Sequence, residues 1–119
     1  MKLSAKLGKE DRISKHDEIA RVFNLGKRAS DGIIRLYMLA NNLGRSRVAI
    51  VISRRHGKAV YRNRIKRRCR EAFRTCRDDL PGSYDYVINP RVGVDLSVDA
   101  IRQSLRDLAT RAMTKQESK

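Results

Sequence analysis

The chain has 119 residues, and we interpret residues 1–119 as a single domain. Lys and Arg total 28 against 13 Asp and Glu, and the resulting formal net charge of +15 opposes compaction unless a polyanion neutralises it. No stretch approaches the ~20 apolar residues of a membrane-spanning helix, and the first residues lack the apolar core of a signal peptide. A membrane-embedded or secreted protein is therefore disfavoured. We expect a polyanionic partner: nucleic acid, an anionic membrane surface or an acidic protein.

The first expected element is a short helix over residues 14–25. Ser14 stands three residues before Asp17, which resembles a capping box, and Gly26 occupies the position of a helix C-cap. The apolar positions between them follow helical spacing, at Ile19, Val22 and Phe23. Residues 1–11 and 114–119 are polar, and we expect both of these ends to be flexible.

Two apolar runs, residues 33–40 and 47–53, predict β-strands, and the NNLGRS sequence between them predicts a hairpin connection. Alternate residues of a strand share a face. The second strand would therefore direct one aliphatic face to the core, composed of Val48, Ile50 and Ile52. Its opposite face carries the small residues Ala49 and Ser53, over which a groove can lie.

A basic helix is predicted next, around YRNRIKRRCREAFR, residues 61–74. At 100° per residue one arc of this helix is apolar, and we expect it to dock on the sheet. This arc contains Ile65, Cys69, Ala72, Phe73 and Cys76. The basic residues lie on the opposite side, and residues 54–77 hold eleven of them against one acid, Glu71. A solvated helix usually alternates its charges, so a surface of one sign indicates a binding surface.

The chain then turns at Pro81-Gly82, and residues 84–89 predict a further strand that ends at Pro90. From Ser97 onward a helical period predicts an amphipathic helix whose buried positions are Ile101, Leu105, Leu108 and Ala112. The order α-β-β-α-β-α is typical of a small α+β sandwich.

Two cysteines, Cys69 and Cys76, lie ~10 Å apart along a helix axis, which is beyond disulfide reach. Without a neighbouring His they make no zinc site, so we interpret them as buried, reduced core residues, as in a cytoplasmic protein. His16 and His56 have no carboxylate or cysteine partner in sequence, and we expect His56 to contact backbone or phosphate rather than act as a base.

Arginine outnumbers lysine nine to two among the eleven basic residues of 54–77. The planar guanidinium binds phosphate oxygens in pairs and stacks on bases, which favours nucleic acid over other polyanions. A membrane surface would require an exposed apolar face opposite the charge, but here that face is expected to enter the core. Composition alone leaves DNA and RNA equally open.

The stretch SRRHGKAVYRNRIKRRCREAFR resembles the signature segment of the protein subunit of bacterial ribonuclease P. The RNR motif corresponds to Arg62, Asn63 and Arg64, and the likeness extends over about residues 10–110. The resemblance implies an α-β-β-β-α-β-α sandwich, similar to domain 2 of ribosomal protein S5. Its central sheet would be mainly antiparallel, with a left-handed β-α-β crossover where the general rule predicts a right-handed one.

The resemblance also implies a function. The partner would be a catalytic RNA, and the ribonucleoprotein would cleave the 5′ leader from precursor tRNA. Mg²⁺ would be held mainly by the RNA, which performs the hydrolysis. The chain would hold no catalytic residue, metal or organic cofactor of its own, and we expect the protein alone to be a monomer.

Two sets of site residues follow from the resemblance and from the charge pattern. The surface for the catalytic RNA is predicted to contain Arg54, Arg55, Lys58, Arg62, Asn63, Arg64, Lys66, Arg67, Arg70 and Arg74. The cleft for the single-stranded leader is predicted to contain Ile19, Phe23, Arg35, Tyr37, Arg47 and Val51. Many members of the family carry a further aromatic residue where this chain has Ile19. Two alternatives stay open: a general RNA-binding protein or chaperone without a role in leader binding, and a nuclease that acts alone.

Overall fold

The computed structural model describes residues 7–117, and side chains as far as Thr114. The helices and strands are α1 (His16–Leu25), β1 (Lys27–Ser30), β2 (Ile34–Ala40), β3 (Arg47–Ile50), α2 (Ala59–Cys76), β4 (Tyr84–Pro90) and α3 (Val98–Glu117). Three short 3-10 helices accompany them, at Lys9–Asp11, Arg54–His56 and Arg77–Asp79. This is the α-β-β-β-α-β-α order that the family resemblance implies.

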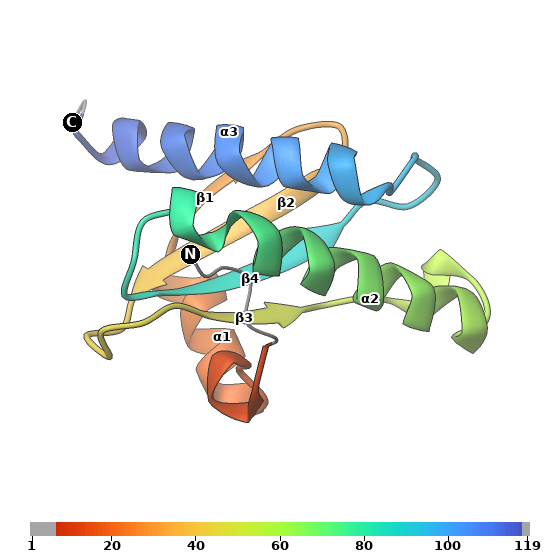
Figure 1. Cartoon of the computed structure of the whole chain (residues 1–119), viewed down its shortest axis with the longest axis horizontal. Helices are drawn as coiled ribbons and strands as arrows, with labels where there is room; N and C mark the ends of the chain where they lie inside the picture. Colours follow the sequence, from red (N-terminus) through yellow and green to blue (C-terminus); the bar gives the residue numbers. More distant parts are fainter. Residues whose placement is uncertain (1–6, 118–119) are drawn as a thin grey trace.

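The four strands form one sheet in the order β1-β2-β4-β3, with helices on both faces (Figure 1). The β1–β2 and β2–β4 pairs are antiparallel, whereas β3 and β4 are parallel and α2 connects them. In Figure 1, α2 lies in front of the sheet and both strands run to the right with β4 above β3. The crossover is therefore left-handed, as the resemblance implies and against the general rule.

The predicted hairpin between β2 and β3 is wrong, because β4 lies between these two strands. The reason is burial of β4 on both of its faces. Tyr86 and Ile88 face α2 and α3, while Asp85 and Val87 face α1, and all four are buried. A strand covered on both faces belongs in the interior of a sheet. Strand β1 was not predicted from the residue pattern, because its sequence KRAS has a single apolar position, Ala29.

The larger core lies between the sheet and the two long helices. All five residues of the predicted apolar arc of α2 are buried there, and so are the four predicted core positions of α3. On the opposite face α1 covers a smaller core, in which Val22 packs near Ala49 and Val87. The predicted division of β3 into a core face and an opposite face is confirmed at Val48, Ala49 and Ile50, but the strand ends at Ile50 and does not extend to residue 53 as predicted.

The predicted capping box at Ser14 is wrong. Helix α1 begins at His16, its N-cap Lys15 makes no side-chain cap bond, and Asp17 instead accepts from the backbone N–H of Glu18 at 3.0 Å. The helix starts late because the preceding chain is extended: the N–H of Ile13 donates to the carbonyl of Val48 on β3, at 2.9 Å.

Gly26 ends α1 as expected, but its role is close packing. Its φ of −79° is open to any residue. However, a Cβ there would stand 2.5 Å from the carbonyl oxygen of Val22 and 2.6 Å from that of Met38. Only glycine allows α1 to approach β2 this closely.

The chain ends are described only in part. In the N-terminal arm, Lys9–Asp11 forms a 3-10 helix, and Asp11 Oδ1 lies 3.6 Å from Arg77 Nη1. At the other end α3 continues to Glu117. The expected flexibility of residues 1–6 and 118–119 lies outside the described residues. Within residues 7–117 no helix is long and apolar enough to cross a membrane.

Both cysteines are free and buried, as predicted. Burial raises the pKa of the Cys69 thiol to about 12 and that of the Cys76 thiol to about 11, from an ordinary value of 9.0. Burial likewise raises the pKa of Tyr86. The folded chain therefore retains these protons at a pH where the unfolded chain releases them.

We predict a specific loss of stability at alkaline pH. The two thiols contribute fully to the free energy of unfolding below pH ~9. This contribution is lost as pH rises through the folded pKa values, at roughly 1 kcal/mol per pH unit per thiol. Urea unfolding of the wild type between pH 8 and about 11 measures this slope. The C69A/C76A variant is the matched control and should show a shallower slope. Equal slopes would contradict the assigned pKa values.

Candidate nucleic-acid interface

The outward face of α2 forms a continuous basic surface. Arg64 and Arg67 are exposed and Arg70 is half-buried, and none of the three pairs with a carboxylate of residues 7–114. Among the predicted RNA-binding residues, Arg74 is the only one that forms an ion pair within the described part of the chain, with Glu71 at 2.6 Å. Arg64, Arg67 and Arg70 are therefore displayed on an ordered helix without a compensating carboxylate among residues 7–114.

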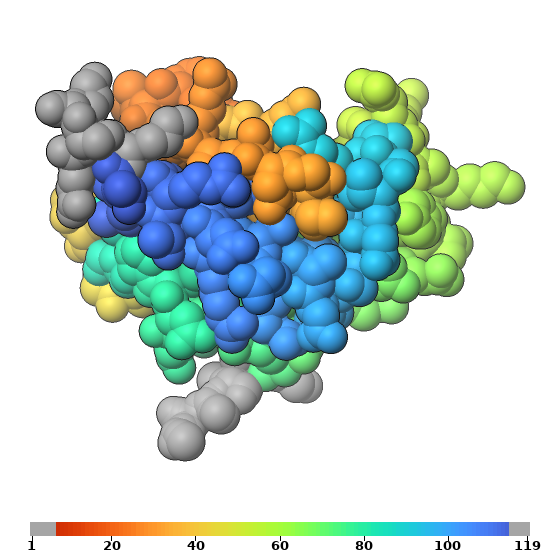
Figure 2. Space-filling view, turned by 90° about the horizontal axis from the view of Figure 1, so that it is seen from above, coloured from red at the N-terminus to blue at the C-terminus, as the bar shows by residue number. Residues whose placement is uncertain are grey.

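The loop before α2 holds three further cations at the helix start, where the helix dipole is positive. Ser53 Oγ accepts from the N–H of Arg55 at 3.2 Å, and Gly57 turns the chain with a φ of 116°. His56 is buried, and its Nε2 lies 2.9 Å from the carbonyl oxygen of Pro90, so the ring ties the loop to the end of β4. The expected backbone contact of His56 is thus confirmed. Figure 2 shows the light-green segment at the start of α2 projecting from the body of the molecule.

Arg12 also belongs to this surface, although no pattern in the sequence predicts it. The extended chain at Arg12 pairs with Val48 on β3, which brings its side chain to α2. A hollow of about 400 Å³ there is lined by Leu7, Arg12, Arg67, Arg70, Glu71 and Arg74. Burial, followed by repulsion from Arg12, lowers the pKa of Arg70. A bound anion would relieve this repulsion.

An open cleft lies between α1 and α2, beside the free edge of β3. It has a volume of about 430 Å³ and is lined by His16, Ile19, Ala20, Phe23, Ile50, Val51, Ile52 and Lys66. Three of the predicted leader-binding residues, Ile19, Phe23 and Val51, therefore lie together. Lys66, predicted for the other surface, contributes a cation to the cleft.

The groove does not lie over Ala49, where its small side chain had suggested it. Ala49 is buried in the small core together with Val22 of α1. The cleft lies instead where β3 ends, because residues 12–13 cover the first part of the outer edge of β3 and leave residues 50–52 uncovered.

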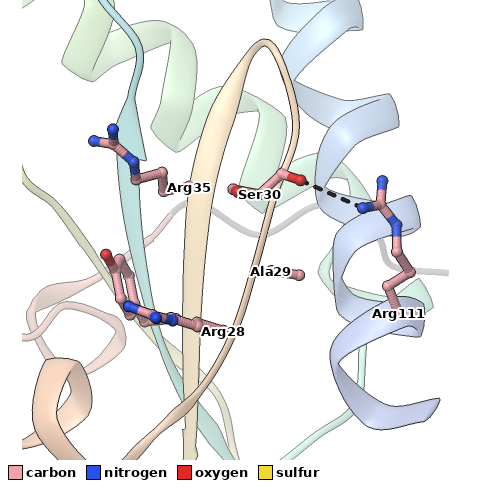
Figure 3. Close-up of a pocket in the computed structure, with 6 residues that line it drawn as sticks. Arg28, Ala29, Ser30, Arg35 and Arg111 are labelled. Atoms are coloured by element: carbon pink, nitrogen blue, oxygen red, sulfur yellow. Dashed lines mark hydrogen bonds between the residues drawn. The ribbon is translucent and has the colours of Figure 1, made fainter. Parts of the chain in front are cut away.

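Tyr37 stands at the border of the cleft. Its ring meets that of Phe23 edge to face, with centroids 4.5 Å apart. Tyr37 and Arg35 also line a second hollow, of about 320 Å³, together with Arg28, Ala29, Ser30 and Arg111 (Figure 3). The aromatic pair thus separates the cleft from a basic hollow at the edge of β1.

Arg47 is engaged by its own chain. Its Nε and Nη2 donate to the two carboxylate oxygens of Asp85 at 2.9 and 2.7 Å, and Glu18 lies 3.5 Å away. Asn41 donates to the same Asp85 carboxylate at 2.8 Å. The hydrogen bonds from Arg47 to Asp85 raise the pKa of Arg47. Arg47 therefore lies in a structural ion pair and does not line the cleft.

Together the sheet, the basic helix and the cleft define a small α+β nucleic-acid-binding protein. Among the described residues, no three His, Cys, Asp or Glu side chains lie close enough together to hold a metal ion. The family model for ribonuclease P matches residues 7–113.

Relatives of known identity agree with this match. The chain is 38% identical over 103 residues to the ribonuclease P protein component of Pelotomaculum thermopropionicum, covering 86% of this chain and 92% of that one. It is 39% identical over 110 residues to the ribonuclease P protein component of Marinobacter nauticus, covering 90% of this chain and 82% of that one.

Two solved structures extend the likeness to the fold. The ribonuclease P protein of Thermotoga maritima superimposes with a TM-score of 0.74 at 30% identity, covering 84% of this chain and 96% of that chain. The ribonuclease P protein of Staphylococcus aureus superimposes with a TM-score of 0.73 at 28% identity, covering 86% of this chain and 94% of that chain. The chain belongs to the ribonuclease P protein family. It is the protein subunit of a ribonucleoprotein endonuclease that processes the 5′ ends of tRNA, and its partner is an RNA subunit.

We predict that Arg47→Met costs about 3 kcal/mol of stability, because it leaves the buried Asp85 carboxylate without its cation. Adding Asp85→Leu should recover much of this loss, and urea unfolding of the single and double variants measures both effects. At conditions where the variant remains folded, its affinity for RNA should be that of the wild type. A stable Arg47→Met protein with weakened RNA binding would instead assign Arg47 to the interface.

Proposed function

We propose that the outward arginines of α2 bind the catalytic RNA, and that the cleft beside β3 holds the single-stranded 5′ leader of precursor tRNA. The observation that carries the proposal is the basic face of α2, where Arg64, Arg67 and Arg70 have no carboxylate partner among residues 7–114. Phosphate groups are the partners that an uncompensated row of guanidinium groups favours.

The cleft suits a single strand better than a duplex. Its walls are apolar or aromatic, at Ile19, Phe23, Val51 and Ile52, and Lys66 stands beside them. Unpaired bases stack on aromatic rings and contact apolar walls, while a nearby cation neutralises the backbone. A general RNA chaperone would need the basic surface but would gain nothing from such a cleft.

In this proposal the RNA holds Mg²⁺ and performs the hydrolysis. The acids nearest the basic surface do not fit as metal ligands, because Glu71 pairs with Arg74 and Asp11 with Arg77. The chain would contribute by screening the repulsion between the two RNA molecules, which lowers the magnesium concentration that they need. Its place of action would be the cytoplasm, with the free protein a monomer.

We predict that Arg64→Gln with Arg67→Gln weakens binding to the catalytic RNA and flattens the salt dependence of binding by about one unit per lost phosphate contact. Filter binding over a series of salt concentrations measures both quantities. The variant R102Q/R106Q, on α3, removes the same charge elsewhere and should keep the wild-type slope. Unchanged affinity of the α2 variant would refute the assigned surface.

We predict that Tyr37→Leu reduces the affinity of the reconstituted ribonucleoprotein for precursor tRNA by about 1–3 kcal/mol, the value of a lost base stack. Leucine keeps most of the packing against Phe23 but has no aromatic face. Affinity for mature tRNA, which has no leader, should not change. Tyr84→Leu, on the other face of the sheet, is the matched control.

Equal losses for precursor and mature tRNA in the Tyr37 variant would favour a general RNA-binding role. Specific 5′ cleavage by the purified protein with Mg²⁺ and no partner RNA would instead show a nuclease that acts alone.

A further inference from the structure

The basic hollow at the edge of β1 includes Arg35 and Tyr37, which were predicted for the leader, but its other two arginines have no role in the function described so far. It is about 320 Å³ in volume, and three of its six lining residues are arginines: Arg28, Arg35 and Arg111. In Figure 3, the Arg111 side chain reaches from α3 to the backbone of Ser30, whereas the Arg35 side chain extends away from Arg111 on the other side of the strands. Three arginines from three separate elements, β1, β2 and α3, thus line one open hollow.

Most of the donor groups of these arginines are unused. Arg111 Nη1 donates to the carbonyl oxygen of Ser30 at 3.3 Å, and Arg35 Nη1 donates to Asn89 Oδ1 at 3.2 Å. The side chain of Arg28 has no hydrogen bond or ion pair with any described residue. Each guanidinium carries five N–H donors, so most of them remain available to an anion.

No carboxylate of residues 7–114 neutralises the hollow by an ion pair. Asp31 is the acid that interacts with the hollow, because the charge of Arg111 helps to lower the pKa of the Asp31 carboxyl. Asp31 is occupied with its own turn, because its Oδ1 accepts from the N–H groups of Ile33 and Ile34 at 2.8 and 3.0 Å. Burial is the largest single effect and raises the pKa of Asp31, but the backbone hydrogen bonds and the other interactions together outweigh it, so that the pKa is lowered. An external anion therefore faces little competition.

A polar row connects this hollow with the cleft across the sheet. Asn89 Nδ2 donates to the carbonyl oxygen of Val51, which lines the cleft, at 2.9 Å. Asn89 also accepts from Arg35, its neighbour across β2 and β4, and Arg35 pairs in register with Ser30 on β1. The row thus runs from β3 through β4 and β2 to β1, beside the Phe23–Tyr37 ring pair.

The length of this row fits a short single strand. Three strand spacings of roughly 4.8 Å separate β3 from β1, or about 14 Å. A stacked strand advances about 3.4 Å per nucleotide, so the row spans roughly four nucleotides.

We propose that Arg28, Arg35 and Arg111 form a phosphate site for the RNA leader after it crosses the sheet from the cleft. This inference rests on the proposed leader-binding function and extends it to the distal part of the leader. Single-stranded RNA is favoured because a ring, Tyr37, and three arginines line the same open hollow, which suits a base and its phosphate together. An acidic protein segment would lack a group to stack on the ring.

The test compares precursor tRNAs with leaders of about two and about eight nucleotides, on either side of the span of the row. Binding is measured with the protein assembled on its RNA subunit, for the wild type, for R28Q and for R28Q/R111Q. The R102Q/R106Q variant loses the same charge as the double variant. R28Q alone removes a side chain without partners among the described residues, so its folding should not change; thermal unfolding checks each variant.

We expect the wild type and the control to bind the long leader more tightly than the short one. The double variant should lose roughly tenfold in affinity for the long leader, the value of one charged hydrogen bond, with little change for the short leader. For the long leader, the slope of log affinity against log salt concentration should become less steep by about 0.7 for each lost phosphate contact.

Each other outcome has a separate meaning. A long-leader advantage that persists in both variants would overturn the phosphate site and leave leader binding intact. Equal losses for both leaders, or weaker assembly with the RNA subunit, would assign the arginines to the partner RNA and overturn the proposal. No leader-length effect in the wild type would contradict the proposed leader cleft itself.

Discussion

The docking of the apolar arc of α2 on the sheet is the interaction on which the rest of the structure depends. Like charges three or four residues apart on the outer face each cost about 0.2–0.5 kcal/mol, and several such pairs amount to roughly 2 kcal/mol. Burial of Ile65 and Phe73 contributes about 1.5–3 kcal/mol each, which outweighs this repulsion. The arginines are thereby displayed on an ordered helix, so binding an RNA does not have to order them from a flexible tail.

Periodicity alone predicted the parts of the fold that bury a regular apolar pattern. The arc of α2 and the buried positions of α3 follow from a spacing of 3.6 residues, and the two faces of β3 follow from alternation. The resemblance to a family added what periodicity does not contain: the third strand before α2 and the left-handed crossover. Strand β1 has one buried residue, Ala29, and is held by pairing with β2 and by contact with α3, both of which are tertiary effects.

The separation of functional from structural arginines could not be predicted, because it depends on strand register. Arg35 and Arg47 both stand in β-strands and both face the α1 side of the sheet. Arg47 lies opposite Asp85 on β4, and this carboxylate takes up its charge. Arg35 lies opposite Asn89, whose amide accepts a hydrogen bond and leaves the charge free. One pairing thus makes a core ion pair, and the other leaves the Arg35 charge without a carboxylate among residues 7–114. Arg12 is a similar case, since only its pairing with β3 brings it to α2.

If the cleft holds the leader as proposed, Ile19 determines how a single strand would bind there. An aliphatic side chain excludes water from the cleft but has no aromatic face for a base. Stacking then falls on Phe23 and Tyr37, whose rings already contact each other edge to face and so offer limited free surface. More of the binding free energy must come from the backbone, through Lys66 at the cleft and the arginines at the edge of β1. Contacts to phosphate carry no base information. A leader cleft with this balance, as proposed here, would therefore select an unpaired, flexible segment next to the tRNA by its backbone rather than by its sequence.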